Sequence, residues 1–208
     1  MQQTAPLGRP RNDLADIKIL QSALRLYGEA GWHGFNFTKI AAKAGVGKSS
    51  MYARWTEREE LLIDAFRALV VSPGPVGEDP RTILINEIEY RLREYLGPHR
   101  GAVRRVFVEM CSSSIPVITE AYEHVYVRPI KEINVRLWDF KKAGIIPGHI
   151  SVTRLLDAIE GSVLMRTFCL PEEDVECFLT EVEEYAELLV DDQLRGINTT
   201  SMRIVHVS

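Results

Sequence analysis

Gly47, Lys48 and Ser49 are the residues whose types and order most directly suggest a chemical role. Residues 42–49 fit a permissive phosphate-loop pattern, in which glycines let backbone amides approach a phosphate and a lysine and a hydroxyl follow. The same residues could instead open a short helix that presents a cation and hydroxyl groups to DNA. The first interpretation predicts a nucleotide-binding protein, and the second predicts a DNA-binding protein.

The residues before Gly47 distinguish these interpretations. A phosphate loop follows a buried strand, but residues 38–43 are rich in alanine and lysine, which favour a helix. No later apolar run ends in an aspartate that could hold the accompanying metal ion. We therefore expect a helix, a turn and a helix, and we keep nucleotide binding through Gly47, Lys48 and Ser49 as the alternative.

Residues 36–55 have the features of a helix-turn-helix. Asn36 can cap the first helix, Gly45 can adopt the positive φ of a sharp turn, and Val46 can fill the angle between the helices. The second helix, residues 48–55, then has an outward polar face made of Lys48, Ser49, Ser50, Tyr52 and Arg54. Lysine and serine near its start can reach base edges, whereas tyrosine and arginine suit phosphate oxygens.

The charge of the chain is unevenly distributed. Residues 1–56 contain eight basic and three acidic residues, a net charge of +5, and the whole chain carries −4, which leaves −9 for the rest. A positive segment on a negative body suggests that the segment meets a polyanion. Residues 1–11, with Gly8-Arg9-Pro10-Arg11, could be an arm that enters a narrow minor groove or a flexible tail with two solvated charges.

The rest of the chain has helical apolar spacing and no convincing strand. We therefore expect an all-α protein, with a DNA-binding helix-turn-helix domain at residues 1–56 and a helical effector-binding and dimerisation domain at 57–208. A Thr56-x-x-Glu59 capping box should open the helix that joins them. Pro129 should kink or divide a long helix, because it lacks an amide hydrogen.

Several function classes find no support in the sequence. The chain has no signal-peptide-like segment and no apolar run that could span a bilayer, so we expect a cytoplasmic protein without a membrane partner. Cys111, Cys169 and Cys177 form no metal-binding pattern, and we expect them to be small buried hydrophobic residues. No catalytic triad or defined carboxylate pair is present, so we expect neither an enzyme nor a cofactor.

Between Ile17 and Leu62, about a quarter of its length, the chain resembles the DNA-binding head of TetR-family transcriptional regulators. The similarity consists of the string Phe37-x-x-Ile40-Ala41-x-x-Ala44-Gly45-Val46-x-Lys48-x-x-x-Tyr52, followed by Trp55 and Glu59-Glu60-Leu61-Leu62. The resemblance implies a homodimeric repressor that binds a (pseudo)palindromic operator and releases it when a small molecule binds the second domain. A helical ligand-binding dimer without DNA function is a further alternative.

The resemblance also implies the residues that contact DNA. These are Thr38, Lys39, Lys48, Ser49, Ser50, Tyr52, Arg54 and Arg58. Three positions depart from the family pattern: Gly47 stands where serine is usual, Ser49 where glycine or alanine is common, and Glu57 where serine often precedes the arginine. An acid at position 57 would weaken a phosphate contact by Arg58, because it places a negative charge beside the phosphate.

The body should supply the dimer interface and the effector pocket. The last two helices, expected at about 152–169 and 172–190, offer the interface residues Leu155, Ile159, Val163, Phe178, Val182, Tyr185 and Leu189, although these could simply complete the monomer core. A small, mostly apolar effector could contact Phe66, Tyr90, Phe107, Met110, Cys111, Tyr122, Tyr126, Trp138, Met165 and Phe168, for each of which core packing is the alternative. His99 and His124 could bind a metal ion or an anion, or could be ordinary surface histidines.

Overall fold

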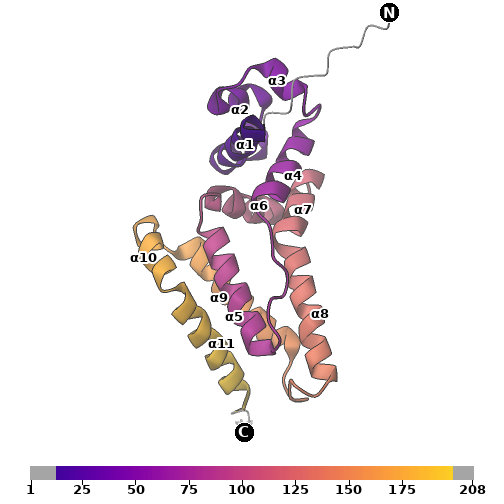
Figure 1. Cartoon of the computed structure of the whole chain (residues 1–208), viewed down its shortest axis with the longest axis vertical. Helices are drawn as coiled ribbons and strands as arrows, with labels where there is room; N and C mark the ends of the chain where they lie inside the picture. Colours follow the sequence, from indigo (N-terminus) through magenta and orange to yellow (C-terminus); the bar gives the residue numbers. More distant parts are fainter. Residues whose placement is uncertain (1–12, 199–208) are drawn as a thin grey trace, which may run out of the picture.

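The computed structural model describes residues 13–198, and this part of the chain is helical and contains no strand. Its N-terminal end is a small head (Figure 1). The head consists of α1 (Asp13–Gly34), α2 (Phe37–Ala44) and α3 (Lys48–Tyr52), and α4 (Arg58–Leu69) leads from it into the body. None of the described helices is long and apolar enough to cross a membrane.

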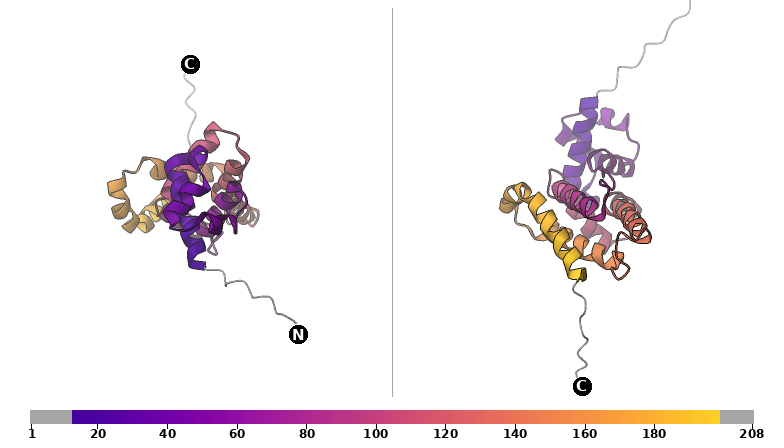
Figure 2. Two further views of the ribbon diagram at one scale, coloured as in Figure 1. Left: turned by 90° about the horizontal axis from the view of Figure 1, so that it is seen from above. Right: turned by 60° about the horizontal axis from the view of Figure 1, so that its bottom comes forward.

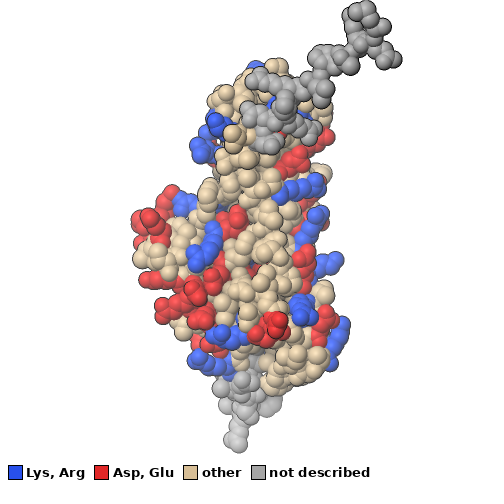
Figure 3. All heavy atoms as spheres, viewed as in Figure 1, with Lys and Arg blue, Asp and Glu red and all other residues tan. Residues whose placement is uncertain are grey.

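The body is built from the remaining helices, and its α10 projects from one side in two of the views (Figures 1 and 2). The elements are α5 (Pro80–Tyr95), α6 (Arg100–Ser112), α7 (Pro116–Tyr122), the π-helix η1 (Glu123–Val127), α8 (Arg128–Lys142), α9 (Val152–Cys169), the 3₁₀ turn η2 (Glu172–Asp174), α10 (Val175–Thr180) and α11 (Val182–Asn198). Acidic side chains gather over α10 and α11, away from the head (Figure 3).

The head is packed directly onto the body through α1 and α6. The two helices approach so closely at Gly28 that a Cβ added there would lie 2.7 Å from the backbone carbonyl carbon of Gly101. Glu109 of α6 accepts hydrogen bonds from the Tyr27 hydroxyl (3.0 Å) and from the backbone amide of Trp32 (3.0 Å). One carboxylate thus fixes the end of α1, where Gly31 breaks the helix with a φ of 64°.

Several helix boundaries differ from the expected ones. Helix α3 ends at Tyr52 rather than Trp55. The capping box of α4 is formed by Glu57 and Glu60, so the expected Thr56–Glu59 box was wrong by one residue. The expected final helix is interrupted at Glu181, which separates α10 from α11.

The expected division near Pro129 is present in the structure, where η1 separates α7 from α8 and the proline lies in the first turn of α8. The cysteines were predicted incorrectly, because Cys111, Cys169 and Cys177 are exposed. Helical spacing shows that a helix has an apolar face, but it does not show whether a single small residue near that face is buried or exposed.

Candidate nucleic-acid interface

Local interactions in the turn between α2 and α3 fix the angle between the two helices. Asn36 is extended (φ −155°), and its side chain accepts a hydrogen bond from the Lys39 amide (3.0 Å), which caps α2. Gly45 is left-handed (φ 68°, ψ 33°), and the amide of Val46 returns to the carbonyl of Ala41 (3.0 Å). No heavy atom lies within 4 Å of a Cβ built at Gly45, so the turn requires glycine for its backbone conformation rather than for space.

Five of the predicted DNA contacts lie on an exposed face of the head. They are Thr38 and Lys39 at the start of α2 and Lys48, Ser49 and Tyr52 on α3. Tyr52 is 58% exposed, although its ring packs edge-on against Phe37 (5.1 Å between centroids). The ring is therefore held at the surface. A polar face at the start of α3 is the arrangement by which a recognition helix reads the major groove.

Ser50 and Arg54 lie at the same end of the head, but they contact each other and α1. The Arg54 guanidinium forms an ion pair with Asp16 and donates hydrogen bonds to the Ser50 carbonyl oxygen (2.8 Å) and to Ser50 Oγ (2.7 Å). These contacts tie the C-terminal end of α3 to α1. Both side chains are half-buried. To contact a phosphate, each would have to give up its hydrogen bonds or ion pair within the chain.

Arg58 has a different environment from the one expected for a phosphate contact. Its guanidinium carbon lies 4.0 Å from the centre of the Trp32 ring, and Nη1 donates hydrogen bonds to the carbonyl oxygens of Phe35 (3.0 Å) and Trp32 (3.4 Å). Arg58 therefore connects the start of α4 to the turn after α1, which disfavours the predicted phosphate contact. Arginine suits this position because its plane can stack on an aromatic ring while its edge donates hydrogen bonds.

The phosphate-loop alternative is contradicted by the local fold. The residues before Gly47 form α2, and no strand is present anywhere in the described residues. Lys48 and Ser49 begin a helix of five residues that follows another helix, so the buried strand that presents a phosphate loop is missing from this position.

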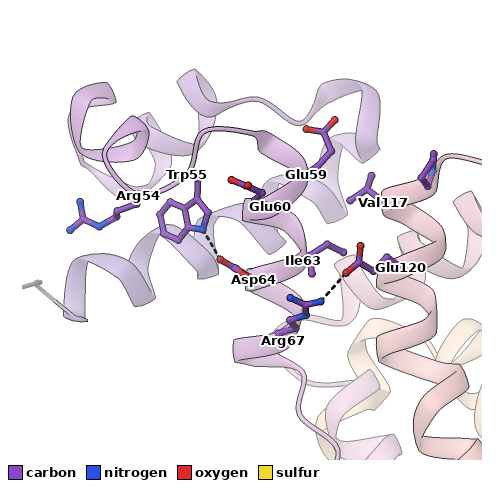
Figure 4. Close-up of a pocket in the computed structure, with 10 residues that line it drawn as sticks. Arg54, Trp55, Glu59, Glu60, Ile63, Asp64, Arg67, Val117 and Glu120 are labelled. Atoms are coloured by element: carbon purple, nitrogen blue, oxygen red, sulfur yellow. Dashed lines mark hydrogen bonds and ion pairs between the residues drawn. The ribbon is translucent and has the colours of Figure 1, made fainter.

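A groove of about 520 Å³ separates α4 from α7 at the junction of head and body (Figure 4). Trp55, immediately after α3, donates from Nε1 to Asp64 of α4 (2.9 Å). Arg67 of α4 forms an ion pair with Glu120 of α7 (2.9 Å). Helix α4 therefore contacts both the segment that follows α3 and the body.

The predicted pocket residues are only partly brought together. Phe107 contacts Tyr122, Tyr126 and Phe168 with ring centroids 5.1–5.8 Å apart, whereas Phe66 belongs to the head-side core next to Tyr27. Tyr90 and Met110 are half-buried; Cys111, Trp138, Met165 and Phe168 are exposed. Trp138 and Met165 thus lie at the surface of the described residues, and a single pocket lined by all ten residues stays a prediction.

The body core contains a buried ionic cluster that the sequence analysis missed. Arg91, 1% exposed, lies between Glu87 (Nε to Oε1, 2.7 Å) and Glu160, with which it also forms an ion pair. Burial raises the pKa of both carboxyl groups, and Arg91 opposes that shift. The i,i+4 spacing of Glu87 and Arg91 was a visible signal, but such pairs usually lie on exposed helix faces.

The predicted dimer residues fall into two groups. Leu155, Ile159, Val163 and Val182 are buried within the single chain, which favours the core alternative for these four residues. Phe178, Tyr185 and Leu189 are half-buried. The exposed apolar side chains on α9 and α11 are instead Met165 and Leu188, which are 62% and 55% exposed, together with Phe168.

Comparison with known proteins agrees with the DNA-binding head. Residues 19–65 match the family model "Bacterial regulatory proteins, tetR family". The chain is 27% identical over 157 residues to the uncharacterized HTH-type transcriptional regulator Rv1556 of Mycobacterium tuberculosis, with 73% of this chain and 75% of the relative covered. It is 22% identical over 198 residues to the uncharacterized HTH-type transcriptional regulator YdeS of Bacillus subtilis, with 93% and 95% covered.

Solved structures share the fold over most of the chain. A putative fatty acid metabolism regulator of Clostridium perfringens superimposes with a TM-score of 0.65 at 15% identity, covering 86% of this chain and 97% of the other. FadR from Bacillus subtilis, solved in complex with stearoyl-CoA, gives 0.59 at 17% identity, covering 86% and 98%. These identities show a common fold and no more. Residues 19–65 are therefore similar to the DNA-binding domain of the bacterial tetR family, and the relatives that match most of the chain are HTH-type transcriptional regulators.

Proposed function

We propose that this regulator is a ligand-responsive repressor that binds a (pseudo)palindromic operator as a homodimer and is released by a small, mostly apolar effector. The observation that carries the proposal is the exposed polar face at the start of α3, held at a defined angle to α2 by the left-handed Gly45. A major groove accepts a helix presented in this way.

Within this proposal, the DNA contacts divide by chemistry. Lys48 and Ser49, at the start of α3, read base edges. Thr38, Lys39 and Tyr52 contact phosphates, which fix the orientation of the head without reading sequence. Ser50 and Arg54 hold the end of α3 against α1 and contribute to DNA binding through the position of the helix.

The homodimer is proposed to form through the outer faces of α9 and α11. Met165, Phe168 and Leu188 are exposed large apolar side chains, and Tyr185 and Leu189 lie partly buried beside them. A two-fold axis through this region would bring two copies of the same surface together, as the most common symmetric assembly requires. The two recognition helices must then lie roughly 34–36 Å apart, or a multiple of that distance, to enter successive major grooves on one face of DNA.

An effector in the body would act through α4. This helix contacts the end of α3 through Asp64 and Trp55, and it contacts α7 through Arg67 and Glu120 (Figure 4). FadR, which has the same fold, was solved in complex with stearoyl-CoA, and this supports a ligand-responsive function. A shift of α4 by a few ångströms would change the separation of the recognition helices and lower operator affinity.

Selection from a random DNA library with the purified full-length protein tests this proposal. The expected product is a (pseudo)palindrome whose half-sites are separated by about one helical turn or a multiple of it. Binding should weaken steeply with salt, because phosphate contacts release counterions. Failure to enrich any sequence, together with salt-independent or absent binding, would refute it and leave a ligand-binding helical protein without DNA function.

A further inference from the structure

Helix α3 cannot hold its own orientation, because it has only five residues, Lys48–Tyr52. Gly47 precedes it and has no side chain that could accept hydrogen bonds from its first amides. Ala53 follows it in a right-handed conformation (φ −72°, ψ −12°), rather than in the left-handed conformation that often closes a helix. Contacts outside the helix must therefore fix α3 in the head.

Three side chains in and just after α3 make these contacts. Met51 is fully buried in the hydrophobic core, and the Tyr52 ring packs edge-on against α2. Arg54 forms an ion pair with Asp16 of α1. Among the hydrogen bonds and ion pairs in the described part of the chain, this pair is the one that joins α1 to α3 and the three residues after it. Asp16 therefore supplies the polar attachment of α3 to α1.

Arg54 takes part in this attachment through several atoms. Its Nε faces Asp16, and its Nη1 donates to the Ser50 carbonyl oxygen (2.8 Å) and to Ser50 Oγ (2.7 Å). The side chains of Arg54 and Asp16 are 21% and 27% exposed, so solvent screens their pairing less than it screens a fully exposed pair. Figure 4 shows Arg54 pointing away from the groove between α4 and α7. A phosphate could pair with Arg54 Nε only by displacing Asp16.

We propose that Asp16 is a positioning residue for DNA recognition, whose carboxylate fixes the end of α3 against α1 through Arg54. The start of α3, with Lys48 and Ser49, then meets the base edges at a defined angle. This inference rests on the proposed function and deepens it. Its sign is opposite to simple electrostatics, because an acidic side chain close to a polyanion should oppose binding. Removing the charge of Asp16 should instead weaken binding to the operator.

The attachment itself is tested without DNA, by amide hydrogen exchange of the full-length protein. The amides of Ala53, Arg54 and Trp55 donate to carbonyl oxygens of α3 at 3.0, 2.9 and 3.0 Å. In Asp16→Asn, which keeps the size of the side chain, they should exchange about fivefold faster, the effect of one partly buried ion pair. Asp16→Glu keeps the carboxylate and should retain most of the protection.

Glu29→Gln is the matched control. Glu29 is another carboxylate of α1, and its ion pair with Lys43 (2.8 Å) leads to α2 rather than to α3. This variant removes the same charge from the same helix, so a general effect of charge or of α1 stability would appear in it as well. Exchange at the end of α3 should stay unchanged in Glu29→Gln.

The consequence for DNA is measured with two duplexes, the operator selected with the wild-type protein and a scrambled duplex of the same length and composition. Asp16→Asn should lower operator affinity about fivefold, matching the change in exchange, and should not weaken binding to the scrambled duplex. The dependence of log K on log salt should keep its slope, because no phosphate contact is gained or lost. Asp16→Glu and Glu29→Gln should keep the ratio of the two affinities.

Three results would overturn the role of Asp16. The first is unchanged exchange at the end of α3 in Asp16→Asn, and the second is an unchanged ratio of the two affinities. The third is tighter binding of both duplexes with a slope steeper by about one, which would show that Asp16 competes with a phosphate for Arg54. Failure of the wild-type protein to bind any DNA sequence would instead overturn the proposed function, and amide exchange would still decide whether Asp16 holds α3.

Discussion

Replacing Glu109 by glutamine should loosen the head from the body while leaving the size of the side chain unchanged. Glu109 Oε1 accepts from the Trp32 amide, and Oε2 accepts from the Tyr27 hydroxyl, each at 3.0 Å. A glutamine offers one oxygen and one NH₂ group. In either orientation of the amide, its NH₂ group faces the Trp32 amide or the Tyr27 hydroxyl. That group then loses its acceptor or must reorient.

The size of the effect follows from these two contacts. Losing one hydrogen bond to a charged acceptor in a partly buried position should cost about 1–2 kcal/mol, since the Tyr27 hydroxyl can rotate and accept in return. For a chain of this length, that corresponds to a fall in Tm of roughly 2–8 °C. Urea unfolding followed by tryptophan fluorescence measures the free energy of unfolding, and Trp32 reports on the junction itself.

Tyr27→Phe and the double variant complete a thermodynamic cycle for this junction. If Glu109 acts through Tyr27 as well as through Trp32, the Glu109→Gln change costs less in the Tyr27→Phe background, with a coupling energy of at least about 0.5 kcal/mol. Unchanged stability of Glu109→Gln, or strict additivity of the two substitutions, would refute the reasoning that this carboxylate joins head and body.

Three further predictions concern the turn, the start of α4 and the body core. Gly45→Val should lower the free energy of unfolding by about 1–2 kcal/mol, because a branched side chain resists a φ of 68°; calorimetry would measure this loss. Arg58→Lys should lower stability through lost stacking on Trp32 and leave the salt dependence of DNA binding unchanged, whereas a phosphate contact would reduce it. Burial raises the pKa of Tyr126 to about 12, above its ordinary value of about 10, so stability should fall as pH rises through this interval; Tyr126→Phe should make the fall shallower in urea unfolding at stepped pH.

The helix-turn-helix could be predicted because its signals are local. The cap at Asn36, the glycine at position 45 and the inward-facing Met51 on α3 all lie within about twenty residues. The family resemblance rests on the same stretch. Neither kind of information required knowledge of what the head packs against.

The features that were missed depend on pairings across the fold. Glu109 is far from Tyr27 in sequence, and Glu160 is far from Arg91, so spacing could not connect them. Arg58 was assigned to DNA by the family resemblance, and its stacking on Trp32 was not visible in the sequence. The apolar period of α9 correctly indicated a buried face, but it could not distinguish a face buried in the monomer from one buried between subunits.

The central claim, that the exposed start of α3 binds DNA, is tested most directly by comparing Lys48→Ala with Lys142→Ala on the selected operator. Both lysines are exposed, and Lys142 lies at the end of α8 in the body. Affinity is measured over a series of salt concentrations. The proposed interface predicts that Lys48→Ala weakens binding about tenfold or more and flattens the dependence of log K on log salt by about one, while Lys142→Ala changes neither. Equal behaviour of the two variants would contradict it.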